Sequence, residues 1–165
     1  MKGLIAYIVG DYATALQEWR PLAEQGNALA QALLGGIYGE GKGVPQDDAE
    51  AVKWYRLAAE QGQVFAQYNL GKRYSDGRGV PQDYAEAVKW WRLAAEQGDA
   101  DAQTSLGVMY DNGQGVSQDY AEAVRLYRLA AEQGDAGAQN NLGLMYYEGQ
   151  GVLQDNVLAH MWYNL

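Results

Sequence analysis

The stretch DYAEAVKWWRLAAEQG, residues 83–98, decides how this chain folds. Asp83 is a favourable N-cap residue, and Glu86 follows three positions later, which is the arrangement of a capping box. Gly98 stands at the end, where a helix favours a residue in the left-handed conformation. The apolar residues between these signals fall at i, i+4 and i+7 on one stripe: Ala87, Trp91 and Ala94. The stretch therefore predicts one amphipathic helix with a defined beginning and end.

The whole chain repeats this pattern with a period of 36 residues. Residues 47–82 and 83–118 are identical at 23 of 36 aligned positions, and residues 83–118 and 119–154 are identical at 26. The N-cap aspartate recurs at every period: Asp11, Asp47, Asp83, Asp119 and Asp155. A fixed period of this length is typical of repeat proteins, in which each repeat is one supersecondary motif.

A second, shorter helix completes each repeat. Ala66, Leu70 and Tyr74 lie at i, i+4 and i+8 and form its apolar stripe. A glycine beside the stripe recurs in every copy: Gly35, Gly71, Gly107 and Gly143. Because glycine inside a helix costs about 1 kcal/mol relative to alanine, its recurrence predicts a close approach of two helices.

The loop GRGVPQ and its equivalents separate the two helices. Its Gly-x-Gly suggests a phosphate-binding loop. The third glycine of that motif is missing in every copy, however, and no strand precedes any of them. A chain-reversing turn is the better interpretation.

These elements predict an all-α fold, an α/α superhelical solenoid of 36-residue helix-turn-helix repeats. An amphipathic helix pair cannot bury its apolar stripe alone, so neighbouring repeats must stack, in a right-handed array. We expect a single repeat domain with N-terminal helices and four repeats, the last incomplete, over these ranges: domain 1–165, N-terminal helices 1–26, repeats about 28–62, 64–98, 100–134 and 136–165.

The two ends depart from the repeat pattern. Pro21 predicts a kink or a local start in the helix at 11–26, and residues 2–9 resemble half of an unpaired shorter helix. The segment DNVLAHMWYNL stops within a helix and has no capping glycine. We expect the array to continue beyond it, or the last helix to be covered by another molecule.

The residues that stay fixed between repeats form a specific pattern. It reads Ala-x-x-x-Leu-Gly-x-x-Tyr-x-x-Gly-x-Gly-Val, followed by Asp-Tyr-x-x-Ala-x-x-Trp-x-x-x-Ala-Ala-x-x-Gly, and covers nearly the whole chain. It resembles the Sel-1-like repeat family, longer-looped relatives of tetratricopeptide repeats. The resemblance implies that the shorter Leu-Gly helices line a concave side. It also implies an adaptor or scaffold in protein complexes and favours a bacterial protein, with a periplasmic or exported location among the alternatives. Several relatives carry paired cysteines, and this chain has none.

The differences between repeats gather on the shorter helix. Of the 13 differences between residues 47–82 and 83–118, nine fall within 63–76, and several are spaced i, i+3, i+7 and i+10 on one face. The predicted partner-binding residues on this face are Phe65, Tyr68, Lys72, Ser75, Asp76, Thr104, Val108, Asp111, Asn112, Asn140, Leu144, Tyr147 and Glu148. The same varying surface takes in Ala32, Gly36, Gly39, Glu40 and Asp101.

We interpret this face as a groove for a peptide or protein segment. Its predicted anchors are aromatic residues helped by nearby charge: Phe65, Tyr68, Lys72, Asp111 and Tyr147. The Lys/Asn clamp by which some tetratricopeptide domains hold a carboxylate is not reproduced, because other repeats have Gly, Val or Leu in place of Lys72. Two alternatives remain: exposed positions drift without a role, or the chain is a structural module that assembles with itself through open ends.

The charge of the chain argues against nucleic acid as a partner. The net charge is −9 and no basic run occurs, so the groups that neutralise phosphates are lacking. Anionic membrane surfaces are disfavoured for the same reason, and no apolar run approaches the ~20 residues of a membrane span. The start MKGLIAYIVG has no small-residue cleavage site, so we expect a soluble protein without a signal peptide and leave its compartment open.

The residue inventory gives little support to an enzyme. One histidine, His160, and no cysteine cannot form an ordinary zinc site, and no catalytic motif occurs, so we expect neither a metal nor a cofactor. The remaining alternative is a hydrolase that uses carboxylates of the groove: Glu40, Asp76, Asp111 and Glu148. They belong to different repeats, whereas a retaining glycosidase needs its carboxylates ~5–5.5 Å apart.

Overall fold

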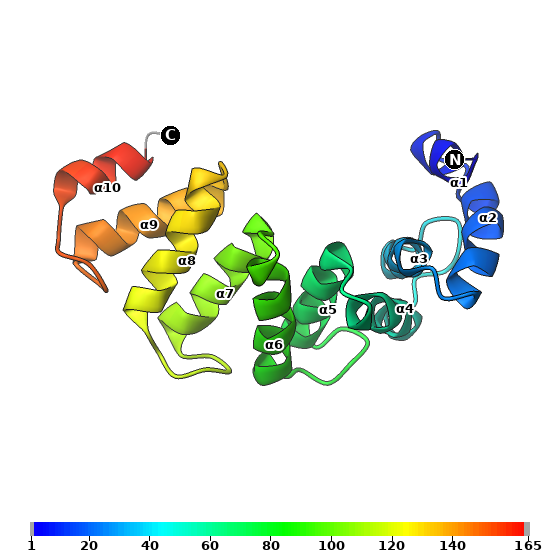
Figure 1. The fold of residues 1–165 in the computed structure, drawn as a ribbon, viewed down its shortest axis with the longest axis horizontal. Helices are drawn as coiled ribbons and strands as arrows, with labels where there is room; N and C mark the ends of the chain where they lie inside the picture. Colours follow the sequence, from blue (N-terminus) through cyan, green and yellow to red (C-terminus); the bar gives the residue numbers. More distant parts are fainter. Residues whose placement is uncertain (1, 164–165) are drawn as a thin grey trace. The chain divides into compact units, whose positions relative to one another are not determined.

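The computed structural model describes residues 2–163, and all regular secondary structure in that range is helical (Figure 1). The chain divides into two compact units, Met1–Asp83 and Tyr84–Leu165. Unit 1 contains α1 (Lys2–Ile8), α2 (Tyr12–Glu24), α3 (Ala28–Glu40), α4 (Asp48–Glu60) and α5 (Val64–Asp76). Unit 2 contains α6 (Tyr84–Glu96), α7 (Ala100–Asn112), α8 (Tyr120–Glu132), α9 (Ala136–Glu148) and α10 (Asn156–Tyr163). The predicted all-helical repeat fold is confirmed.

Of the predicted capping box, only the aspartate half is formed, because the backbone N–H of Asp47 donates to the Tyr38 carbonyl oxygen at 2.9 Å and not to Glu50. The Asp47 carboxylate accepts a hydrogen bond from the Glu50 backbone N–H at 2.9 Å, and Asp119 caps α8 in the same way. The N3 glutamate pairs with a basic residue one turn further on, as Glu50 does with Lys53 at 3.3 Å. Such an exposed pair adds only a few tenths of a kcal/mol. Helix initiation therefore rests mainly on the aspartate cap.

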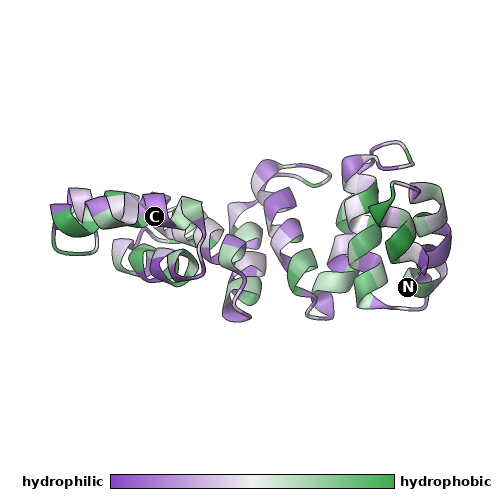
Figure 2. Ribbon diagram, turned by 90° about the horizontal axis from the view of Figure 1, so that it is seen from above, coloured by the Kyte–Doolittle hydropathy of each residue, from purple (hydrophilic) through white to green (hydrophobic). Residues whose placement is uncertain are grey.

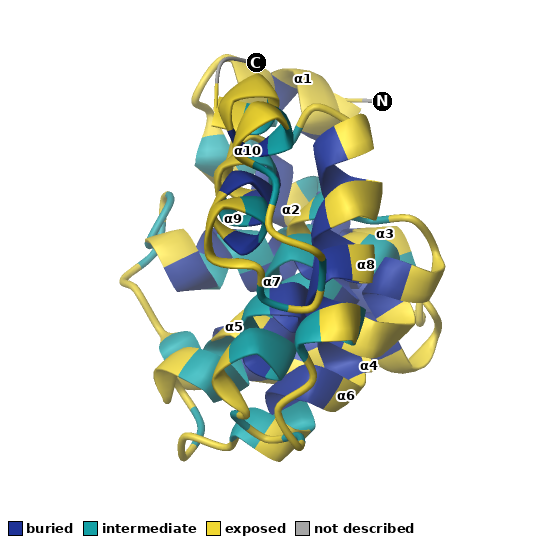
Figure 3. Ribbon diagram, turned by 90° about the vertical axis from the view of Figure 1, so that its left-hand side faces the viewer, coloured by how far each residue is buried: buried dark blue, intermediate teal, exposed yellow. Residues whose placement is uncertain are grey.

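Within each unit, successive helices pack against one another along their apolar sides (Figures 2 and 3). Two of the recurring helical glycines lie directly against an aromatic ring of the following longer helix. A Cβ on Gly107 would lie 2.6 Å from the Tyr127 ring, and one on Gly35 would lie 2.6 Å from the Tyr55 ring. The shorter and longer helices can meet at this distance only because a hydrogen stands where other residues have a side chain. The predicted close helix–helix contact is confirmed.

The loop glycines also have a packing role. Gly115 has a φ of +69°, and a Cβ there would lie 2.4 Å from the Tyr84 carbonyl oxygen at the start of α6. The Gly-x-Gly loop is thus a turn pressed against the first turn of the preceding longer helix, and the turn interpretation is supported.

A buried glutamine of the shorter helix forms a hydrogen bond to the helix before it, a role that the repeat pattern does not reveal. Its side-chain amide donates to a backbone carbonyl eight residues earlier, as from Gln31 to Ala23 at 3.0 Å and from Gln103 to Ala95 at 3.3 Å. The amide oxygen of Gln103 accepts in turn from Gln133 at 2.9 Å. A buried amide costs free energy unless it is paired, so these hydrogen bonds account for a fixed glutamine in an apolar interface.

The longer helices carry a recurring stripe of charged residues, in α4 Glu50, Lys53, Arg56 and Glu60, and this stripe is not entirely a solvated outer face. Its arginines reach the tyrosine of the following shorter helix: Arg56 donates to the Tyr74 hydroxyl at 2.6 Å, and Arg128 donates to Tyr146 at 2.9 Å. These residues therefore help to fix one helix on the next. At the N-terminal end, α2 begins at Tyr12 and runs through Pro21 to Glu24, so a helix start at Pro21 is wrong.

Candidate functional site

The varying residues of unit 1 gather around one polar pocket. Its volume is about 190 Å³, and its lining comes from α3, α4, α5 and the loop after α5: Gly39, Glu40, Tyr55, Asn69, Lys72, Arg73, Asp76 and Arg78. Four residues of the predicted varying surface therefore meet in one place: Gly39, Glu40, Lys72 and Asp76. We call this cavity the unit 1 pocket.

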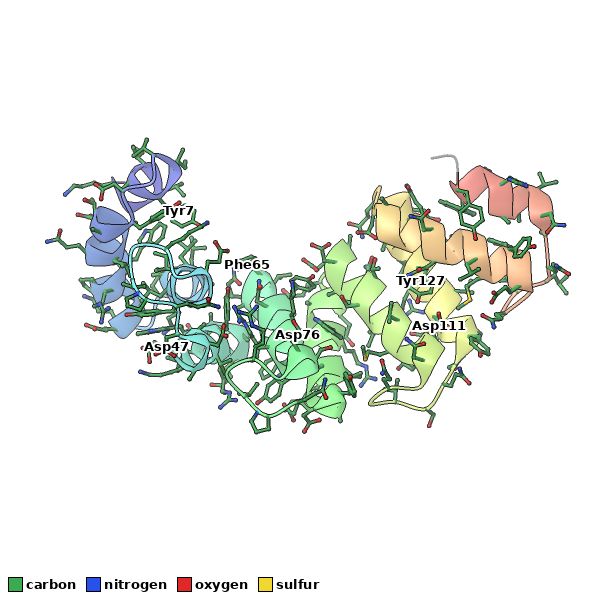
Figure 4. The ribbon with its side chains drawn as sticks, turned by 180° about the vertical axis from the view of Figure 1, so that it is seen from behind. Tyr7, Asp47, Phe65, Asp76, Asp111 and Tyr127 are labelled. Carbon is green, nitrogen blue, oxygen red and sulfur yellow. The ribbon has the colours of Figure 1, made fainter. Side chains whose placement is uncertain are left out.

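Phe65 stands at the opposite end of α5 from Asp76 (Figure 4). Its side chain is 48 % exposed, and its ring contacts the edge of the Tyr55 ring with the centroids 6.2 Å apart. Tyr55 itself is buried and lines the pocket. Phe65 thus offers an exposed aromatic surface directly beside the unit 1 pocket.

A charge cluster at the base of the pocket was missed by the sequence analysis. Arg73 stands where the other repeats have buried apolar residues: Ile37, Met109 and Met145. Its guanidinium forms an ion pair with Asp48, which occupies the position of Tyr84 and Tyr120 in other repeats, and Arg78 pairs with the same carboxylate at 3.2 Å. The internal comparison of repeats contained this signal, because both members of the pair depart from the pattern together.

The electrostatics of the cluster follow from its burial and charges. Burial tends to raise the pKa of the Asp48 carboxyl, but the positive charges of Arg73 and Arg78 hold that pKa below its ordinary value. Glu40 is bound to Lys42 at 2.6 Å. Among residues 2–163, Lys72 has no ion-pair partner.

Two members of the predicted varying surface are buried instead. Ala32 is 0 % exposed within α3, so its placement on a partner-facing surface is wrong. Gly39 is also buried, since a Cβ there would overlap the Arg73 guanidinium. The absent side chain makes the room that a charged group needs in an otherwise apolar layer.

In unit 2, part of the predicted face serves the packing of the repeats. The Thr104 hydroxyl donates to Asp135 at 3.0 Å, and Val108 packs against the core of the unit. Asp111, on α7, accepts a hydrogen bond from the Tyr127 hydroxyl of α8 at 3.3 Å (Figure 4). Burial raises the pKa of Asp111 despite this hydrogen bond, which acts to lower it.

The exposed part of the unit 2 face lies on α9. Leu144 is 42 % exposed and Tyr147 57 % exposed. Both line an apolar pocket of about 240 Å³ with Ala159, His160 and Tyr163 of α10. The remaining predicted residues divide by exposure, with Asn112, Asn140 and Glu148 exposed and Tyr68 and Ser75 half-buried.

The acidic side chains bear on two alternatives, a metal site and a hydrolase. Among the described residues, no group of three or more His, Asp or Glu side chains is arranged to hold a metal ion. Two of the four carboxylates considered for a hydrolase already have partners, since Glu40 binds Lys42 and Asp111 accepts from Tyr127. None of the helices in 2–163 has both the length and the apolar character required to cross a membrane.

Comparison with solved structures identifies close structural relatives. A protective antigen present in uropathogenic Escherichia coli strains, which displays an SLR fold, shares 49 % sequence identity with a TM-score of 0.87 over 90 % of this chain and 32 % of that protein. A Sel1 repeat protein from Oxalobacter formigenes shares 40 % identity with a TM-score of 0.91 over 98 % of this chain and 67 % of its own. A third, from Klebsiella pneumoniae, shares the fold at 23 % identity and a TM-score of 0.63 over 98 % of this chain and 81 % of its own.

No match to this chain is found among curated proteins. The sequence pattern that defines the Sel1 repeat matches four consecutive segments, residues 28–63, 64–99, 100–135 and 136–165. These segments include every helix from α3 to α10. The chain therefore belongs to the Sel1 repeat family.

Proposed function

We propose that this chain is a scaffold that binds a peptide or protein segment through the shorter helices of its repeats. Sel1 repeat proteins are generally protein-interaction scaffolds. The observation that carries the proposal is the unit 1 pocket, where exposed Phe65 and Lys72 flank a polar cavity that replaces part of the apolar layer. The repeat fold does not by itself require an exposed Phe65, an exposed Lys72 or a polar cavity between them.

The chemistry of the unit 1 pocket favours a particular kind of segment. Phe65 supplies apolar area that stays in contact with water in the free protein, and Lys72 supplies an unpaired positive charge. A segment with an apolar residue close to an acidic one would satisfy both. Exposed carboxylates on the pocket rim, Glu40 and Asp76, disfavour a long run of acidic residues.

In unit 2 the proposed contact surface is the exposed part of α9. Leu144 and Tyr147 combine an aliphatic and an aromatic side chain beside α10. Large aromatic residues carry a disproportionate share of interface energy, so Tyr147 is the proposed anchor there. The two units are proposed to contribute separate contacts, each within its own shorter helices.

The test begins with affinity capture of partners on the purified chain, followed by calorimetric titration of the captured partner against variants. Replacing both Phe65 and Lys72 with alanine should weaken binding by about 2 kcal/mol or more, with little change in melting temperature. The matched control is Glu60→Ala with Glu132→Ala, two exposed residues at the ends of α4 and α8. If the control pair removes binding and the Phe65/Lys72 pair does not, the site lies on the longer helices.

A self-assembling module is the second candidate, and the apolar surface of the α10 region favours it. Leu153 is 91 % exposed and Val157 79 % exposed, with Met161 and Tyr163 exposed on the same helix. Exposed apolar side chains gathered in one region of a chain can mark a contact with another protein. Sedimentation velocity at increasing concentration separates the candidates: a scaffold of the first kind stays monomeric, and a self-assembling module shows growing species that Val157→Asp abolishes.

A further inference from the structure

The largest cavity described in unit 2 lies away from the varying face, among α6, α7 and α8. Its volume is about 520 Å³. Ala95 of α6, Leu106 of α7 and Leu126 of α8 provide its apolar surface, and Arg92 and Arg125 contribute positive charge. We call this cavity the α6–α8 pocket.

The α6–α8 pocket occurs at a position where the other repeats carry an indole. Leu126 aligns with Trp54, Trp90 and Trp162 in the 36-residue period. In unit 1, the Trp54 side chain is only 7 % exposed and belongs to the same core cluster as Ala23 and Leu34, the counterparts of Ala95 and Leu106. An indole therefore fills in unit 1 the space that Leu126 leaves open in unit 2.

The cationic cover of that indole is kept in unit 2 although the ring is gone. In α4, the Lys53 ammonium lies 5.5 Å from the Trp54 ring centroid, and in α6 Lys89 lies 5.3 Å from the ring of Trp90. Arg125 takes the place of these lysines beside Leu126. It is held by Glu122 through two hydrogen bonds, from Nε at 2.8 Å and from Nη2 at 2.6 Å.

A second guanidinium, from Arg92, also lines the pocket and is held by a hydrogen bond. Arg92 donates to the Tyr110 hydroxyl at 3.0 Å, and both residues line the cavity. A pocket lined by apolar side chains and two positioned arginines suits a flat π-system, because guanidinium groups are attracted to aromatic faces. An aliphatic side chain would fill the volume without using either charge.

We propose that the α6–α8 pocket binds an aromatic side chain, an indole or phenol ring, from a partner protein. The ring would take the place that the missing tryptophan occupies in the other repeats, with Arg125 over its face. Glu96 and Glu122 also line the pocket, and their charges oppose a phosphate group, so a nucleotide base is disfavoured. The site lies on different residues from those of the proposed scaffold face, and it stands independently of that function.

The test uses N-acetyl-L-tryptophanamide as a probe and follows the backbone amides of the ¹⁵N-labelled full chain by NMR. We expect saturable shifts at Ala95, Leu106 and Leu129, which line the pocket. N-acetyl-L-leucinamide should bind about tenfold more weakly, because it lacks the cation–π contact. Equal shifts with the two probes, or tryptophanamide shifts confined to other regions, would overturn the proposal.

The decisive variant is Leu126→Trp, which restores the residue of the other repeats and should fill the pocket from within. We expect it to lose the probe-induced shifts and to keep the melting temperature of the wild type or raise it. Arg125→Gln leaves the cavity open and should weaken binding about three- to tenfold. Glu132→Ala, an exposed change on the same helix, is the control and should bind normally. Unchanged binding by Leu126→Trp, or tighter binding of adenosine monophosphate at these residues, would contradict the assignment.

Discussion

Tyr55 and Tyr127 occupy the same position in two repeats, one in each unit, and both rings are buried beneath a glycine of the shorter helix. Their hydroxyl groups meet different surroundings. In unit 2, Asp111 of the preceding shorter helix accepts a hydrogen bond from the Tyr127 hydroxyl. In unit 1 the equivalent of Asp111 is Gly39, and the Arg73 guanidinium of the following shorter helix fills the space beside Tyr55.

The comparison separates what the repeat needs from what each copy can change. The ring position is constant because the glycine contact sets the distance between two helices. The polar group at the end of the ring can come from either neighbouring shorter helix, and it can be acidic or basic. Burial raises the pKa of Tyr55 to about 12, against the opposing effect of Arg73, and burial raises the pKa of Tyr127 as well. Variation between repeats is therefore concentrated at the edge of a constant packing contact.

The largest expected effect tests the contact between the helical glycine and the aromatic ring, which is constant between the two repeats. Gly107→Leu forces a side chain into the Tyr127 ring and should lower the free energy of unfolding by about 3 kcal/mol or more. Gly35→Leu should cost a similar amount against Tyr55. Urea denaturation measures both losses. Val108→Ala, which only trims a half-buried side chain, should cost about 1 kcal/mol, and equal losses for Val108→Ala and Gly107→Leu would show that the glycine contact is not limiting.

The next largest effect tests the polar group beside the ring, which differs between the two repeats. Arg73→Met installs the residue of the other repeats but leaves Asp48 with only the more exposed Arg78 as a partner. We expect a loss of about 2 kcal/mol, because an incompletely paired, half-buried charge remains. Adding Asp48→Tyr should recover most of that loss, since the pair then matches the apolar repeats. Additive losses in a double-mutant cycle would show that the two positions are independent.

The same pair predicts a difference in acid sensitivity. The folded-state pKa of Asp48 lies below its unfolded value of about 3.9, so its stabilisation is present above that value and is lost as the pH falls through the folded pKa. Between neutral pH and about pH 3, the wild type should therefore lose more stability than the Arg73→Met/Asp48→Tyr variant. Thermal melts across this range check the difference, and parallel curves would contradict it.

The smallest expected effect concerns Asp111, whose pKa is shifted in the opposite direction to that of Asp48. Its folded-state pKa is raised, so its contribution to stability declines as the pH rises from the unfolded pKa through the folded one. Asp111→Asn keeps an oxygen to accept from Tyr127 and removes the charge. We expect a gain of about 1–2 °C in melting temperature at neutral pH, and no gain below about pH 4. A loss at neutral pH would indicate that the charged hydrogen bond outweighs the cost of burial.

Most of the fold could be predicted from the sequence because its determinants are local or strictly periodic. The aspartate caps act within three residues, and the terminating glycines act at one backbone position each. Gly107 was predicted to mark a close contact from recurrence alone, and the structure places the Tyr127 ring against it. The predicted partner-binding residues remain predictions, although the structure brings Lys72 and Asp76 to one pocket.

The period, the two helices of each repeat, their ends and the glycine at which they meet all follow from local signals along the chain. Arg73 and Asp48, 25 positions apart, depart from the repeat pattern together, but their ion pair beside Gly39 is evident only in the folded chain. The cavity that Leu126 leaves between helices is likewise evident only there. The reason is physical. Helix caps and apolar stripes depend on residues that are neighbours along one helix. A pocket is the space left between side chains of several helices, and the sequence pattern of one helix does not predict how those side chains pack.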